Sequence, residues 1–378
     1  MSTRDKLSPA ASILFTRISI GQAVLPNRFV RSATHDFLAE DDGSITDRQV
    51  DLFFRLAEGE VGLIITGHAF VNPGGKASPR QIGIHEDGLV PGLARLATAV
   101  HRFPSRIFVQ LAHAGRQTKE KICGGPPIAP SAVYEPVYKV LPREMTESEI
   151  AGIIDDFVRG AVRAKAAGFD GVQVHAAHGY LLSSFLSPHT NRRSDAWGGP
   201  LENRARIISE IIRGIKSAAG ADFPVAIKLN SSDLMPGGLG IEEAVEAGRR
   251  FESDGLDAIE VSGGTSEAGR GSIWPGVRPE AEEGYFVDAA AKVKGIVRVP
   301  VFGLGGLRTF REMEKVVLEG RVDLVSMSRP LIREPGLVRL FREVKIRKSE
   351  CISCNKCFNP RGIACADLAV RTRRPGLP

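Results

Sequence analysis

Two histidines and a tyrosine follow a short apolar segment near the middle of the chain. Residues 171–174 begin with glycine and have the β-branched composition of a buried strand, and His175, His178 and Tyr180 come soon after them. Titratable side chains at the carboxyl end of a buried strand are typical of active sites in parallel α/β barrels. The spacing therefore predicts a reactive site at this strand end.

Further polar side chains stand at the ends of three other expected strands. They are Thr34 and His35, Gln110 and His113, and Lys228 and Asn230. Because the carboxyl ends of barrel strands meet at one mouth, we expect these groups to share a pocket. A single histidine is more often a core residue, so it is the convergence of many polar groups that favours the functional interpretation.

A third group of residues indicates a phosphate site. Gly305 and Gly306 lie in a glycine-rich turn before an expected helix, where backbone N–H groups and the positive helix terminus attract anions. Ser328 and Arg329 follow the last expected strand and add a hydroxyl and a guanidinium group. Barrels commonly bind phosphate in this place, after strands seven and eight.

The elements that must position these residues alternate between apolar strands and amphipathic helices. A hairpin is expected within residues 13–30, and strands are expected over residues 29–33, 62–67, 106–111, 171–174, 225–229, 258–261, 299–303 and 323–327. Helices are expected over residues 50–57, 89–101, 146–167, 201–218, 241–253 and 310–318. The strands are too uniformly apolar to have one face in water, and no Gly-x-Gly-x-x-Gly motif opens the first helix. The pattern therefore favours an α/β fold of the closed (β/α)8 TIM barrel type over an open doubly wound sheet.

Composition narrows the class of protein further. The 378 residues are 43% hydrophobic and 25% charged, with a formal net charge of +6, as in soluble globular proteins. Basic residues alternate with acidic ones outside residues 342–348 and 371–374, which we interpret as solvated surface, so we expect no nucleic-acid partner. No apolar run is long enough for a membrane helix and residues 1–6 lack a signal-peptide core, so we expect no membrane contact and a cytoplasmic location.

Several motifs resemble the Old Yellow Enzyme family of NADH:flavin oxidoreductases, in the branch of 2,4-dienoyl-CoA reductase. The resemblance covers about residues 12–345 and is carried by LPNR at 25–28, QLAHAGR at 110–116, HAAHGYLL at 175–182, FLSP at 185–188, NRRSD at 191–195 and WGGPLENR at 197–204. It implies a (β/α)8 barrel that binds FMN and is reduced by NADH or NADPH. It further implies hydride transfer from flavin N5 to the electron-poor alkene of a small-molecule substrate. The oligomeric state is left open, with a homo-oligomer as one option.

The resemblance also assigns roles to individual residues. The flavin ring is expected to contact the backbone of Ala33 and Thr34 and the side chains of Gln110 and Lys228, and the phosphate is expected on Gly305, Gly306, Ser328 and Arg329. His175 and His178 are expected to donate hydrogen bonds to the substrate oxygen, and Tyr180 to supply a proton. His35 stands near flavin O4, where much of the family has Thr or Cys, and a histidine there can shift the flavin potential.

Four cysteines cluster near the end of the chain. Cys351, Cys354, Cys357 and Cys365 have the density of a four-thiolate metal site, and relatives in the same branch bind a [4Fe-4S] cluster after the barrel. In those relatives the third cysteine lies one residue later and the fourth is more distant. The alternatives are therefore a [4Fe-4S] cluster, zinc, or reduced thiols without a metal. We divide the chain into an FMN-binding barrel over residues 1–345 and a cysteine-rich extension over residues 346–378.

The sequence leaves two other functions open. The first is a flavin-dependent amine demethylase or dehydrogenase, in which the flavin accepts hydride from the substrate. The second is a barrel without flavin, such as an aldolase or a sugar-phosphate-binding protein. Residues 123–142 and 265–284 are expected to border the mouth, and Arg270, Trp274 and Arg278 are candidate substrate contacts with no chemical signature of their own.

Overall fold

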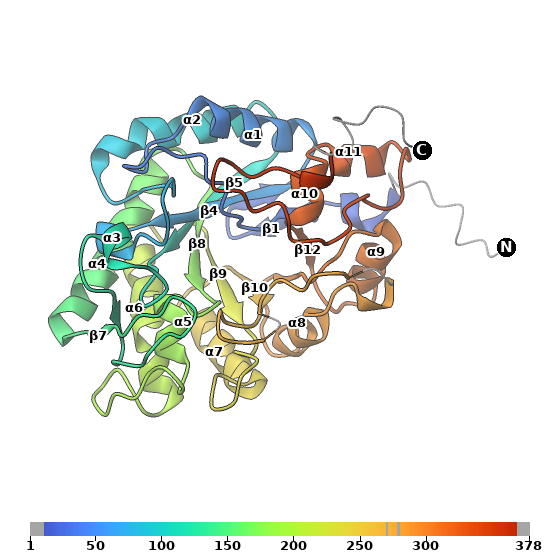
Figure 1. The fold of residues 1–378 in the computed structure, drawn as a ribbon. Coiled ribbons are helices and arrows are strands. Elements are labelled where there is room, and N and C mark those ends of the chain that lie inside the picture. The colour runs from blue at the N-terminus through green and yellow to red at the C-terminus, as the bar shows by residue number, and fades with distance from the viewer. Residues whose placement is uncertain (1–10, 270, 278–279, 369–378) are drawn as a thin grey trace.

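Eight parallel strands close into a barrel in the computed structural model, which describes residues 11–269, 271–277 and 280–368. They are β3 (Phe29–Arg31), β4 (Leu63–Phe70), β5 (Arg106–Ala112), β8 (Gly171–Ala176), β9 (Val225–Asn230), β10 (Ala258–Ser262), β11 (Val301–Gly303) and β12 (Leu324–Met327). Each strand pairs with the next, and β12 closes the ring by pairing with β3 (Figure 1). The predicted (β/α)8 barrel is confirmed.

Helices surround the strands and cover the outside of the barrel (Figure 1). The longer ones are α1 (Asp47–Glu58), α2 (Val90–Val100), α4 (Glu147–Ala166), α6 (Leu201–Ala219), α7 (Ile241–Ser253), α8 (Val287–Lys294) and α9 (Phe310–Leu318). Shorter ones are α3 (Glu120–Cys123), α5 (Leu181–Leu186), α10 (Arg329–Arg333) and α11 (Leu337–Arg342). Helix α4 begins at the capping box of Thr146 and Glu149, which the sequence shows, because each side chain satisfies a backbone N–H that the first turn leaves unpaired.

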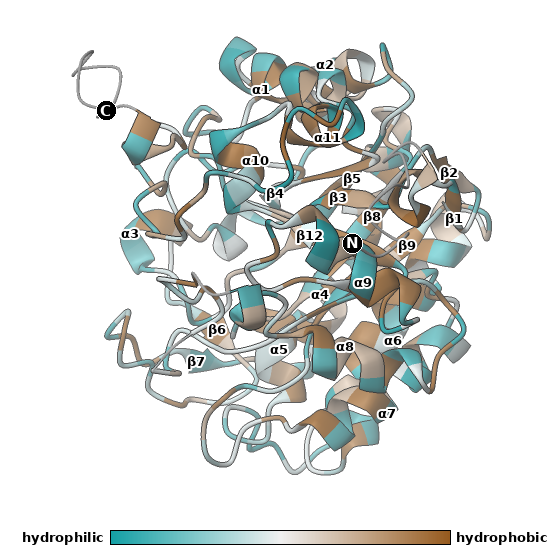
Figure 2. Cartoon of the chain, turned by 90° about the vertical axis from the view of Figure 1, so that its right-hand side faces the viewer, coloured by the Kyte–Doolittle hydropathy of each residue, from teal (hydrophilic) through white to brown (hydrophobic). Residues whose placement is uncertain are grey.

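The core has two parts. Buried side chains between the strands and the helices form the larger part, and Figure 2 shows hydrophobic residues along the barrel strands. The smaller part lies inside the barrel, where Phe108 and Phe302 pack with Ile20 and Leu25 of the predicted hairpin, β1 (Ile18–Ile20) and β2 (Ala23–Leu25). The hairpin therefore contributes to the packed barrel interior. A further short sheet, β6 (Ile128–Ala129) with β7 (Arg143–Glu144), lies in the loops between β5 and α4.

Strand β4 is longer than the sequence predicts. We expected it to end at Gly67, but it continues to Phe70, and its pairing with β5 shifts register between Ile65 and His68. The extension places His68 beside Gln110 of the neighbouring strand. This histidine is an addition to the predicted set of strand-end residues.

Candidate active site

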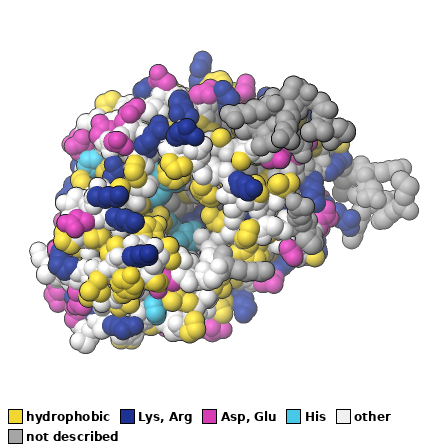
Figure 3. Space-filling view, in the orientation of Figure 1, with side chains coloured by type: hydrophobic (Ala, Val, Ile, Leu, Met, Phe, Trp, Pro, Cys, Tyr) yellow, Lys and Arg dark blue, Asp and Glu magenta, His cyan; other side chains and the backbone are white. Residues whose placement is uncertain are grey.

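One cavity of ≈ 450 Å³ is lined by most of the predicted site residues. Figure 3 shows a hollow on this face with histidine side chains inside it. The predicted residues that line the cavity are Ala33, Thr34, His35, Gln110, His175, His178, Tyr180, Lys228, Gly305, Gly306, Ser328 and Arg329. The barrel thus brings together side chains from six strand ends and the turns that follow them.

Lys228, which lines the cavity, forms a buried ion pair with a residue behind the cavity wall that the sequence analysis missed. Lys228 Nζ lies 3.4 Å from Glu260 Oε2 and donates a hydrogen bond of 2.7 Å to Ser32 Oγ. Glu260 is fully buried and faces Lys228 directly across the pairing of β9 with β10. The expected strand over residues 258–261 gave no signal for it, because its partner Lys228 lies on a different strand.

A chain of amides continues from this carboxylate to the cavity. Gln173 Nε2 donates to Glu260 Oε2 at 2.8 Å, and Gln110 Nε2 donates to Gln173 Oε1 at 2.7 Å. A carboxylate can only accept hydrogen bonds, so Glu260 fixes the direction of both amides. Gln110 is thereby held in one orientation at the place where the sequence predicts a cofactor contact.

His175, His178 and Tyr180 lie together, as predicted. The rings of His175 and His178 are 5.4 Å apart and those of His175 and Tyr180 are 4.8 Å apart, measured between centroids. His178 has a positive φ of 64°, which turns the chain back over the strand end. Its backbone N–H donates a hydrogen bond to Asn230 Oδ1. Asn230 therefore supports the site from behind the cavity wall.

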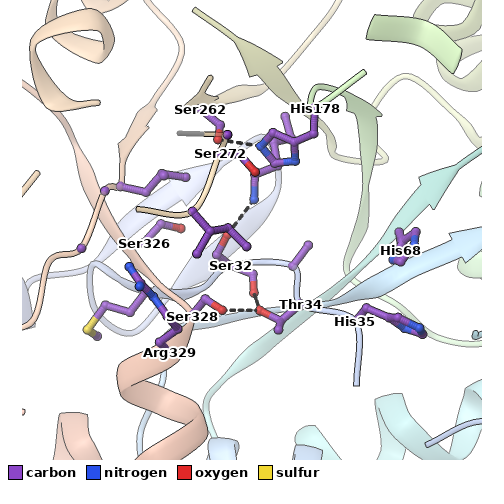
Figure 4. Close-up of a pocket in the computed structure, with 18 of the residues that line it drawn as sticks. Ser32, Thr34, His35, His68, His178, Ser262, Ser272, Ser326, Ser328 and Arg329 are labelled. Carbon is purple, nitrogen blue, oxygen red and sulfur yellow. Dashed lines mark hydrogen bonds between the residues drawn. The ribbon is translucent and has the colours of Figure 1, made fainter. Parts of the chain in front are cut away.

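Burial sets the protonation states of these groups. It lowers the pKa of His178 to about 3 and, together with the neighbouring His178, lowers that of His175 well below its usual value. Enclosure in the cavity, with Tyr138 nearby, raises the pKa of Tyr180. At neutral pH both imidazoles are uncharged and the phenol keeps its proton. His178 Nε2 already contacts Ser262 Oγ at 2.8 Å (Figure 4), so one of its two nitrogens is engaged within the protein.

Two more histidines border the cavity on the side of β3 and β4. His35 Nε2 lies 2.7 Å from Ser78 Oγ, and His68 Nε2 lies 3.4 Å from the Tyr180 hydroxyl. Their rings meet edge to face at 4.9 Å, and Figure 4 shows them side by side. Burial lowers the pKa of His68 to about 4, and burial and the nearby His68 lower that of His35. The predicted His35 thus belongs to a pair of neutral imidazoles.

The predicted phosphate residues form one end of the cavity. Ser328 Oγ lies 2.8 Å from Thr34 Oγ1 (Figure 4). Gly305 and Gly306 have φ values of 120° and 74°, and a Cβ on Gly305 would lie 2.7 Å from the backbone nitrogen of Tyr285. Only glycine fits such a close turn. Helix α9 begins at Phe310, as predicted, and the two glycines line the cavity in the loop that precedes it.

The segment that contains the clustered cysteines lines the cavity next to Ser328 and Arg329. Ser353 and Phe358 line it, and Arg329 Nη1 donates to Asn355 Oδ1 at 2.6 Å and to the carbonyl of Trp274 at 2.8 Å. Figure 1 shows the segment in red beside α10. Part of the predicted cysteine-rich extension, residues 346–378, therefore lies in the wall of the cavity.

The four clustered cysteines do not form a preorganised metal site. Among the residues that the structure describes, no three His, Cys, Asp or Glu side chains converge so as to hold a metal ion. Cys351, Cys354, Cys357 and Cys365 are all free thiols, and burial raises the pKa values of Cys351 and Cys357.

One predicted pocket residue lies elsewhere, and two predicted substrate contacts fall outside the described residues. His113 faces a neighbouring cavity, where its Nδ1 accepts a hydrogen bond from the backbone of Gly115. The expectation that it joins the main pocket is therefore wrong, because β5 ends before it and the chain turns outward. Arg270 and Arg278 lie outside the described residues.

Comparison with known proteins agrees with the predicted resemblance. The model of the NADH:flavin oxidoreductase / NADH oxidase family matches residues 13–346. An NADH oxidase from Thermoanaerobacter brockii is 40% identical over 90% of this chain, which spans 52% of that relative's length. Another relative, a metal reductase from Desulforamulus reducens, is matched over 55% of its length. The chain therefore spans about half the length of these two relatives.

Solved structures show the same fold. A 2-naphthoyl-CoA reductase in complex with 2-naphthoyl-CoA superimposes with a TM-score of 0.85 at 32% identity, over 91% of this chain and 54% of that one. An Old Yellow Enzyme homologue from Zymomonas mobilis gives a TM-score of 0.78 at 25% identity, over 94% and 97% of the two chains. The chain therefore belongs to the NADH:flavin oxidoreductase / NADH oxidase family, the family of the Old Yellow Enzymes.

Proposed function

We propose that this chain is an FMN-dependent NAD(P)H oxidoreductase that reduces an electron-poor carbon–carbon double bond. The observation that carries the proposal is the convergence of His175, His178 and Tyr180 with Lys228 and the glycine loop in one cavity. Bound FMN, once reduced by NADH or NADPH, would supply the hydride.

The residues present fit FMN. Lys228 and Gln110 would hold the polar edge of the flavin ring, since an ammonium group favours the negative charge that builds up there on reduction. The loop of Gly305 and Gly306 leaves room for a phosphate next to backbone N–H groups, and Ser328 and Arg329 would bind its oxygens. Ala33 and Thr34 border the same space.

The substrate would be held and protonated by this chain's own side chains. His175 and His178 would donate to the substrate's carbonyl oxygen, on which negative charge grows as hydride reaches the β-carbon. Tyr180 would then give its proton to the α-carbon, and solvent would return one to it. The reaction consumes one NAD(P)H and one proton for each double bond, and the raised pKa of Tyr180 keeps the donor protonated at neutral pH.

The chemistry of the cavity wall favours this reaction over amine oxidation. Among the described residues that line the cavity, none is Asp or Glu, so a cationic amine would find no carboxylate partner there. The groups present are hydrogen-bond donors suited to a carbonyl oxygen. A flavin-dependent amine dehydrogenase therefore stays the second candidate.

The test is a spectroscopic titration of the purified full chain. We expect FMN absorbance, bleaching by NADH or NADPH without oxygen, and recovery of the oxidised spectrum when an enone such as cyclohex-2-enone is added. Bleaching by an N-methylated amine but by neither nicotinamide would assign the alternative function. Failure to bind added FMN would point to a barrel without flavin.

The iron–sulfur or zinc prediction for the cysteines stays a prediction, and no step of the proposed reaction runs through a metal. Iron and zinc analysis of the same preparation tests it directly. No helix within the described residues could cross a membrane. The unpaired thiols favour a reducing compartment, so we propose that the protein works in the cytoplasm, with its oligomeric state open.

A further inference from the structure

Glu260 is the most enclosed charged group beside the proposed flavin site. Its side chain is fully buried, yet its carboxylate accepts hydrogen bonds from Ser32 Oγ at 2.6 Å, Ser326 Oγ at 2.8 Å and Gln173 Nε2 at 2.8 Å. Burial alone would raise its pKa, but Lys228 and these three donors outweigh burial and lower it. The carboxylate is therefore ionised beside the cavity at neutral pH.

A buried ion pair is a poor indicator of fold stability. Removing two charges from water costs several kcal/mol for each ion, and buried pairs are often no more stabilising than apolar residues of the same size. Here the pair lies on β9 and β10, with Lys228 in the cavity lining and Glu260 opposite the core residue Phe302 of β11. A charge pair in this position points to a role in the site.

The pair changes the charge that a flavin would meet. Lys228 alone would present a full positive charge to the cavity, whereas Lys228 with Glu260 at 3.4 Å presents a nearly neutral dipole. Reduction adds negative charge to the flavin, so a nearby negative group opposes reduction and a positive group favours it. The two side chains therefore act on the flavin in opposite directions.

We propose that Glu260 is a positioning residue that offsets Lys228 and so holds the reduction potential of bound FMN lower than Lys228 alone would set it. This inference rests on the proposed function. Through Gln173, the same carboxylate also fixes the orientation of Gln110 toward the cofactor. A lower potential makes the reduced flavin a stronger hydride donor to the substrate.

The test is the two-electron midpoint potential of FMN in the Glu260→Gln variant, measured by a reductive titration against a reference dye. Glutamine keeps the size of the side chain and removes its charge. We expect a rise of at least ~30 mV, the equivalent of a tenfold tighter binding of reduced relative to oxidised FMN. Lys228→Met is expected to lower the potential, and the double variant is expected to return toward the wild-type value.

One control variant separates the charge of Glu260 from other changes. Glu243→Gln removes a carboxylate that pairs with Arg204 on the outer helices. It should leave the flavin potential unchanged, because Glu243 is not among the residues that line the cavity. An unchanged or lowered potential in folded, FMN-loaded Glu260→Gln protein overturns the inference. A wild-type protein that binds no FMN overturns the proposed function instead.

Discussion

At the scale of single residues, burial decides which groups carry protons. The five histidines with strongly lowered pKa values are neutral at pH 7, and Tyr180 remains a phenol. Neutral imidazoles can donate to an oxygen without adding positive charge to the cavity. The residue types in the sequence suggested acid–base chemistry. Burial keeps Tyr180 protonated and the histidines neutral, so we assign Tyr180 as the proton donor in the proposed reaction.

Replacing the phenol tests that assignment. In Tyr180→Phe we expect the rate of alkene reduction to fall by roughly 10²- to 10⁴-fold, the usual contribution of a general acid. Reduction of the flavin by NAD(P)H should be unchanged, because that step needs no proton from the phenol. Stopped-flow measurement of the two half-reactions checks this.

Tyr138 provides the matched control for this experiment. It lies near Tyr180 but outside the cavity lining, so Tyr138→Phe should keep both rates. Equal losses in the two half-reactions of Tyr180→Phe would instead mean that Tyr180 has a structural role.

At the scale of elements, short irregular segments complete the site that the barrel begins. The extension of β4 brings His68 next to Tyr180, and Asn355 in a loop accepts a hydrogen bond from Arg329. Neither contact follows from the periodicity of an element. Both depend on where a strand stops or how a loop returns across the mouth of the barrel.

The loop contact predicts a role in cofactor binding. Asn355→Ala removes one of the acceptors that orient Arg329 Nη1, so we expect FMN to bind roughly tenfold more weakly, as for loss of one hydrogen bond to a charged group. Fluorescence titration of the apoprotein with FMN measures the dissociation constant.

A variant from the same segment serves as the comparison. The side chain of Asn359 accepts from the backbone of Arg361, and within the described part of the chain none of its hydrogen bonds involves Arg329. Asn359→Ala should therefore bind FMN as the wild type does. An unchanged affinity in Asn355→Ala would mean that the hydrogen bond from Arg329 to Asn355 makes no contribution to FMN binding.

At the scale of the whole molecule, enclosing several neutral histidines makes stability depend on pH. Their folded-state pKa values lie below the usual value near 6.5, so the unfolded chain binds more protons between that value and about pH 4. Their contribution to stability is complete above pH 6.5 and is lost as the pH falls. Each histidine contributes up to ~1.4 kcal/mol per pH unit in that window.

We therefore expect the free energy of unfolding in urea to drop by more than about 2 kcal/mol between pH 7.5 and pH 5. His113 lies outside the main cavity, and His113→Asn removes one of the buried histidines. In this variant the free energy of unfolding should fall less steeply with pH, by the contribution of one histidine. A stability that is flat across this range would contradict the assigned protonation states.

Much of this protein was predictable from its sequence. Apolar strands and capped helices alternate along the chain, and that local pattern requires a parallel barrel whose strand ends share one mouth. The twelve residues predicted at the catalytic and cofactor positions line one cavity for that reason. The motifs that resemble the Old Yellow Enzymes were sufficient to identify the family, because they are long and occur in a fixed order.

Other features required the folded chain. Glu260 and Gln173 look like ordinary strand residues, and they become partners of Lys228 and Gln110 only because neighbouring strands place them at matching heights. His113 leaves the site because β5 ends at Ala112. Local sequence records which residues are apolar or polar, whereas contacts between distant strands depend on register and closure of the barrel.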